Sequence, residues 1–141
     1  PGLDVNAARG NGDTALMLAA AGGHTETVTA LLAAPGLDVN ATNGLGSTAL
    51  RLAAAGGHTE TVTALLAAPG LDVNAATGSG HTALMAAAAR GHTETVTALL
   101  AAPGLDKNAT DGDGTTALAL AEARGHVEIA SLLRALRRRS Q

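Results

Sequence analysis

The sequence contains no cysteine and no phenylalanine, tyrosine or tryptophan. Without cysteine, a disulfide framework, a thiolate zinc site and a cysteine nucleophile are all excluded. Without aromatic side chains, the chain has no flat platforms on which nucleic-acid bases stack. Its net charge of −3 gives no general attraction to nucleic acid or to an anionic membrane. We therefore expect no nucleic-acid partner and no membrane partner.

Long hydrophobic runs are also missing. No stretch reaches the roughly 18 consecutive apolar residues that a membrane-spanning helix needs. The first residues, Pro1 to Asp4, show neither a basic segment nor an apolar one, so we expect no signal peptide. The sequence thus predicts a cytoplasmic location if the protein is expressed in a cell, and otherwise a recombinant product.

The basic residues are unevenly placed, because four of the nine lie in the last eight positions: Arg134, Arg137, Arg138 and Arg139. Cations at the C-terminal end of a helix interact favourably with its dipole, which favours a solvated last helical turn. A short targeting or nucleic-acid tail is the alternative interpretation.

The chain is a repeat. Pro-Gly-Leu-Asp recurs at Pro1, Pro35, Pro69 and Pro103, which gives a period of 34 residues. The predicted units are 1–34, 35–68, 69–102 and 103–141, within a single domain 1–141. The first three units agree at 27 of 34 positions. Such units bury their apolar faces only by stacking on their neighbours, so the repeat predicts an elongated solenoid.

The sequence of each unit predicts a turn, a helix, a second turn, a second helix and an extended segment that leads to the next unit. In the first unit, the threonine Thr14 is suited to cap the first helix, and Gly22-Gly23 to end it. The second helix is expected over about 25–33. A proline then stops it, and residues 37–41 are expected to be extended.

These residues resemble the ankyrin repeat. The family pattern Gly-x-Thr-Pro-Leu-His-x-Ala-Ala is matched by residues 12–20, the following Gly-His by Gly23-His24, and Gly-Ala-Asp-Val-Asn-Ala by residues 36–41. The resemblance covers all four units. It implies an all-α ankyrin-repeat solenoid of four helix-turn-helix units with β-turn fingers.

The near-identity of the units resembles a consensus-type designed ankyrin repeat protein, with a recently duplicated natural array as the alternative. Arg134 replaces Leu32, Leu66 and Leu100 of the inner units, so we expect the last unit to act as a C-terminal cap. The first unit has no such change. We expect a monomer, and self-association through the uncapped N-terminal unit stays open.

The sequence predicts no enzyme and no cofactor. No serine, histidine and carboxylate form a nucleophilic set, and the single lysine, Lys107, rules out a phosphate-binding loop of the Gly-Lys-Ser/Thr type. The repeated histidines His24, His58, His92 and His126 come from units about 10 Å apart, too far to share a metal ion. The resemblance implies that they bond loop backbone between units.

Seven columns vary among the first three units, and the resemblance implies that the variable positions on turn tips and first helices form a concave, partner-binding face. The protein partner itself is not identified by the sequence. The candidate partner-binding residues are Arg9, Asn11, Asp13, Met17, Asn43, Leu45, Ser47, Arg51, Thr77, Ser79, His81, Met85, Arg90, Asp111, Asp113 and Arg124.

Two smaller expectations concern individual variable columns. Leu45, Met17, Arg51 and Met85 are expected to form an exposed apolar patch with one arginine. Leu18 and Leu52 become Ala86, which predicts either refilling by a neighbour or a small pocket. Two alternatives to partner binding stay open: a structural scaffold without a natural partner, and an engineered small-molecule or metal site near Met85, Ala86 and His81.

Overall fold

The computed structural model describes the backbone of residues 4–139 and the side chains of residues 4–137, which leaves Arg138 and Arg139 outside the described side chains. The described residues form eight helices and no named strand. The helices are α1 (Ala15–Ala21), α2 (Thr25–Leu32), α3 (Ala49–Ala55), α4 (Thr59–Leu66), α5 (Ala83–Arg90), α6 (Thr93–Leu100), α7 (Ala117–Ala123) and α8 (Val127–Arg139).

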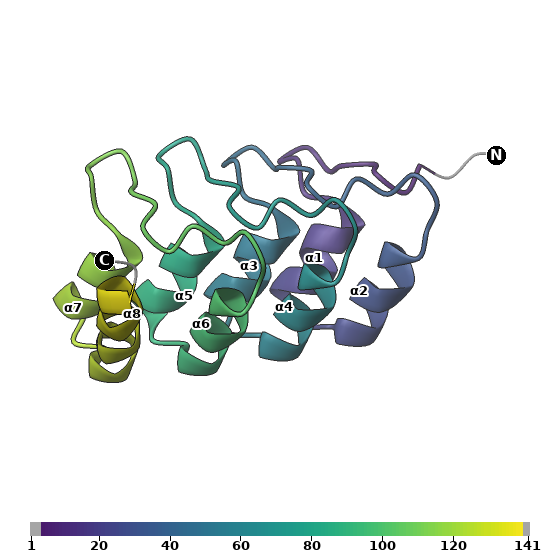
Figure 1. Cartoon of the computed structure of the whole chain (residues 1–141). Helices are drawn as coiled ribbons and strands as arrows, with labels where there is room; N and C mark the ends of the chain where they lie inside the picture. Colours follow the sequence, from purple (N-terminus) through teal and green to yellow (C-terminus); the bar gives the residue numbers. More distant parts are fainter. Residues whose placement is uncertain (1–3, 140–141) are drawn as a thin grey trace.

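The helices stack in two rows (Figure 1). The first helices α1, α3, α5 and α7 each contact the next in one row, and α2, α4, α6 and α8 do so in the other. The loop before each first helix projects from the same side of the stack. We call these loops fingers 1 to 4 (residues 4–14, 36–48, 70–82 and 104–116). The expected all-α repeat solenoid is confirmed.

Each first helix begins at a threonine. The Thr14 hydroxyl accepts a hydrogen bond from the Met17 amide, and Thr48, Thr82 and Thr116 cap their helices in the same way. These bonds satisfy one of the free amides at the helix start. In the first unit the helix ends as expected, because Gly23 adopts a positive φ of 72° that glycine tolerates at no steric cost.

A continuous apolar core runs between the two rows. Val28, Val62 and Val96 are fully buried at the same position of successive second helices. Some of the threonines that disfavour a helix by propensity form hydrogen bonds between units. Thr61 is 1% exposed, and its hydroxyl lies 2.8 Å from that of Thr25 in the preceding unit.

The predicted extended return at 37–41 is wrong, because this segment turns. The Asp38 carboxylate accepts a hydrogen bond from the Asn40 amide at 3.1 Å, and an aspartate that bonds its own backbone two residues on forms a turn. The turn positions Asn40 to hold the next unit: its side-chain amide donates to the Gly70 carbonyl at 2.8 Å, and its oxygen accepts from the Asp72 amide.

The two ends of the stack differ from its middle. Leu31 in α2 is only half-buried, whereas Leu65 and Leu99 at the same position of the next units are fully buried. In the last unit Arg134 is paired with the Glu122 carboxylate, through Nε at 3.0 Å and Nη2 at 2.8 Å. This pair provides the polar side chain that we expected on the outer side of α8.

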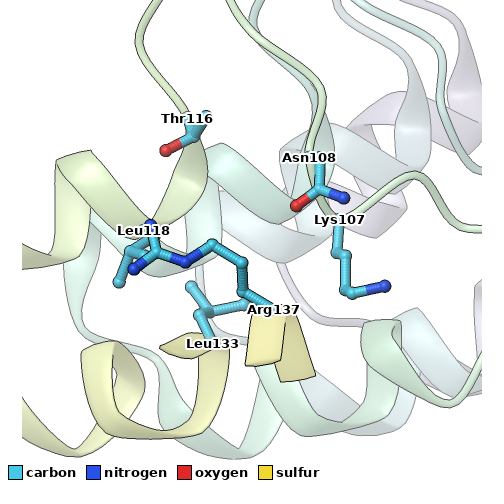
Figure 2. Close-up of a pocket in the computed structure, with 6 residues that line it drawn as sticks. All are labelled: Lys107, Asn108, Thr116, Leu118, Leu133 and Arg137. Carbon is cyan, nitrogen blue, oxygen red and sulfur yellow. The ribbon is translucent and has the colours of Figure 1, made fainter. Parts of the chain in front are cut away.

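A small cavity of about 50 Å³ lies between finger 4 and α8. Figure 2 shows the Arg137 side chain reaching toward Leu118, above Leu133. The Lys107 ammonium points away from this cavity. An arginine can cover apolar surface with its stem, so the Arg137 side chain shields the apolar residues Leu118 and Leu133.

Candidate partner-binding surface

We call the surface formed by the fingers and the first helices the inner face. Neighbouring fingers bond to each other there. The Gly44 amide donates to the Asn11 carbonyl at 2.9 Å, and the Gly112 amide donates to the Ser79 carbonyl at the same distance. The Asn43 side chain also donates to the Asp13 carboxylate at 2.9 Å. Fingers 1 and 2, and fingers 3 and 4, are thereby held in register.

His81 is one of the candidate partner-binding residues. Its side chain is 39% exposed, but its Nε2 lies 3.2 Å from the Asp111 carboxylate in the next finger. The Asp111 side chain is only 7% exposed. This pair is equivalent to Asn43 and Asp13, since both join one finger to the next across the same columns.

The pKa of the Asp111 carboxyl is lowered from its usual value. The hydrogen bond from the Thr115 amide is the main cause; burial opposes it, and the Asp113 amide and His81 act in the same direction as Thr115. Hydrogen bonds to the ionised form favour that form. Asp111 therefore serves as a charged anchor of finger 4 rather than as a free side chain.

Three candidate binding residues are buried, and their expected exposure is wrong. Met17 and Met85 are each 1% exposed, and Ser47 is 2% exposed. The methionines follow the buried Leu16 and Leu84 and belong to the same core cluster. The expected apolar patch therefore does not exist, although Leu45 is 81% exposed at the tip of finger 2.

The other candidates are at least partly accessible. Arg9, Asn11, Leu45, Ser79, Arg90, Asp113 and Arg124 are exposed. Asp13, Asn43, Arg51, Thr77, His81 and Asp111 are half-buried. The exposed members all lie on finger tips or at the C-terminal ends of α5 and α7.

The expectation about Ala86 is partly wrong. Leu18 is 43% exposed and Leu52 is half-buried, so their column is not a fully buried one. Alanine at this position leaves no sealed cavity. Instead, Ala86 is part of an open hollow of about 400 Å³ on the inner face.

Three arginines line this hollow together with His81: Arg51, Arg90 and Arg124. They come from three successive units. The sequence analysis named each of them, but it missed that they converge. The only signal was that two variable columns change to arginine in neighbouring units, and the sequence does not show that these columns face each other.

The repeated histidines bond backbone, as the resemblance implied. The Nε2 atoms of His58, His92 and His126 lie 3.0 Å from the Ala21, Ala55 and Ala89 carbonyls of the preceding units. Among residues 4–137, no group of three or more histidine and acidic side chains is placed to hold a metal ion. Likewise, within the described part of the chain, no helix has the length and apolarity to cross a membrane.

A family model of ankyrin repeats, which contains three copies of the repeat, matches residues 1–77 and 70–138. The chain belongs to the ankyrin-repeat family. Ankyrin repeats are generally protein-interaction modules, and the family is typically non-catalytic. A comparison with curated proteins gives no match.

Proposed function

We propose that this ankyrin-repeat chain is a non-catalytic binding module that recognises a protein partner through its inner face. The observation that carries this proposal is a difference in role between the constant columns of the repeat and the exposed variable columns. Constant residues such as Asn40 and Thr61 make contacts between units, and among the variable residues it is half-buried ones that join neighbouring fingers. In the described part of the chain, the exposed side chains of the variable residues Leu45 and Arg90 take part in no hydrogen bond or ion pair.

Rigidity supports the same proposal. The fingers are bonded to each other through backbone and side chains, so little order has to be gained when a partner binds. A surface that is already ordered pays a smaller entropic cost on association.

The test is a pull-down of partners with the purified chain, followed by affinity measurements with two variants. Leu45→Ser changes the inner face, and Glu60→Gln changes an exposed residue of α4 on the other row. We expect weaker binding for Leu45→Ser and unchanged binding for Glu60→Gln. A partner whose binding is weakened only by Glu60→Gln would overturn the assignment of partner binding to the inner face.

The alternative is a structural scaffold without a partner, such as a consensus-type engineered array. The near-identity of the first three units supports an engineered origin. A ligand that binds only the folded state raises its melting temperature. No stoichiometric complex, and a melting temperature that no candidate protein changes, would favour the scaffold.

We also propose that the chain works as a cytoplasmic monomer and a single domain of four units, with the last unit as its C-terminal cap. The pairing of Arg134 with Glu122 supports the cap. The half-buried Leu31 in α2 is the feature on which self-association would depend. Sedimentation velocity over a range of concentrations tests this, and a dimer that Leu31→Lys dissociates would overturn the monomer.

A further inference from the structure

The hollow on the inner face concentrates positive charge in an acidic protein. Outside α8, the chain has five basic residues, namely Arg9, Arg51, Arg90, Lys107 and Arg124. Three of these five line the hollow, and no acidic residue does. Positive charge is therefore concentrated in the hollow, although the whole chain has a net charge of −3.

Among the described residues, the three arginines have no carboxylate partner. In the described part of the chain the ion pairs are His81 with Asp111 and Arg134 with Glu122. Burial, and after it the positive charge of Arg90, lower the pKa of Arg51. A guanidinium nevertheless stays protonated in proteins. Arg51 and Arg90 therefore lie close enough for their like charges to repel each other.

Arg51 also has an unused donor. Its Nη1 donates to the Ser47 hydroxyl at 3.1 Å. Its Nε is buried, and it is the one buried side-chain nitrogen or oxygen without a hydrogen-bond partner among the described residues. Buried donors are nearly always satisfied, so Arg51 is an exception among the described side chains.

Apolar residues form part of the lining of the hollow. Met85, Ala86 and Leu120 lie beside the arginines, and alanine rather than leucine at position 86 keeps the space open. A short acidic side chain has two parts that this surface can contact: methylenes for the apolar lining, and a carboxylate that a guanidinium binds through two parallel hydrogen bonds.

We propose that this hollow binds the carboxylates of an acidic segment of the protein partner, with Arg51, Arg90 and Arg124 as its ligands. This inference rests on the proposed function and adds the chemistry of the partner. An extended nucleic acid fits the surface less well, because the chain has no aromatic side chain on which its bases could stack.

Hexaglutamate, with hexaglutamine as the uncharged control, is the probe for a titration followed by nuclear magnetic resonance. We expect hexaglutamate to shift the guanidinium signals of Arg51, Arg90 and Arg124 more than those of Arg9 and Arg134. Binding is expected to weaken as salt screens the charges. Equal shifts at all five arginines, or equal binding of hexaglutamine, would overturn the proposal.

Variants provide the second arm. Arg51→Met introduces the residue that the first and third units carry in the same column, which keeps the fold, and Arg90→Gln and Arg124→Gln alter exposed positions. Each is expected to weaken hexaglutamate binding about tenfold, as the loss of a charged hydrogen-bonded pair does. Arg9→Gln, which removes the same charge outside the hollow, should change it less than twofold. Unchanged binding in all three variants would overturn the proposal.

Two further outcomes separate this inference from the proposed function. A protein partner that depends on Leu45 but not on the three arginines would leave the module in place and overturn the acidic-segment site. An oligothymidylate of equal charge that binds more tightly than hexaglutamate, with the same dependence on the arginines, would also overturn it in favour of a nucleic acid.

Discussion

The hydroxyl oxygens of Thr25 and Thr61 lie 2.8 Å apart across the boundary between the first two units. Thr59 and Thr95 repeat this contact at the next boundary, also at 2.8 Å. The second partner of each pair is 1% exposed. The bond therefore lies inside the stack, where losing it cannot be fully compensated by water.

Thr61→Val should lower the free energy of unfolding by about 1 kcal/mol, because valine keeps the shape but removes a buried hydrogen bond. Thr63→Val is the matched control, since the exposed Thr63 hydroxyl bonds only the Thr59 carbonyl of its own helix. We expect that variant to stay within about 0.5 kcal/mol of the parent. Urea unfolding measures both. Equal losses of unfolding free energy in the two variants would show that the hydrogen bond between units adds no stability.

Gly57 tests the packing of a histidine against the preceding unit. A methyl group at Gly57 would lie 2.5 Å from His92 Nδ1, and φ there is +71°. Gly36 has a similar φ of +78° but open space. Gly36→Ala should cost only the backbone strain, about 1–2 kcal/mol, and Gly57→Ala clearly more. Thermal unfolding of the two variants checks this, and equal melting temperatures would contradict the contact.

The leucine column of the second helices tests the gradient of burial along the stack. Leu99→Ala removes a fully buried side chain and should cost about 2–5 kcal/mol. Leu31→Ala removes a half-buried one and should cost clearly less. Urea unfolding, checked for a single transition, gives both values. An equal cost at both positions would mean that Leu31 is covered in solution, which sedimentation would then detect as self-association.

Asp111 makes stability depend on pH. Its pKa is lowered in the folded state, so its charged form stabilises the fold above the ordinary aspartate pKa of about 4. That contribution is lost as pH falls through the lowered folded-state pKa. Asp111→Asn should therefore be destabilised relative to the parent at neutral pH, and the difference should shrink in acid. Asp113→Asn, at an exposed finger tip, is the control. A gap that stays constant with pH would refute the charge effect.

Much of this fold was predictable because the same local sequence pattern recurs from unit to unit. The Thr14 cap, the ends of the helices at glycine and the histidine bonds between units are each dictated by local chemistry that recurs in register. The turn at Asp38 was missed because an aspartate that bonds its own backbone competes with an extended chain, and spacing alone does not decide between them.

The binding surface was less predictable because variability does not report exposure. Met17 and Met85 vary with Arg51 in one column, yet they are buried and the arginine reaches the hollow. Whether a side chain is accessible depends on the neighbouring unit, which the periodicity of a single helix does not describe. The convergence of Arg51, Arg90 and Arg124 depends on the same packing between units.

Because each of these three arginines comes from a different unit, the register of the stack sets the spacing between their charges. Inserting one more copy of residues 69–102 would lengthen the row of guanidinium groups by one step, about 10 Å if the units keep the packing distance of neighbouring helices. The number of units would then set the length of the acidic segment that the row of arginines binds.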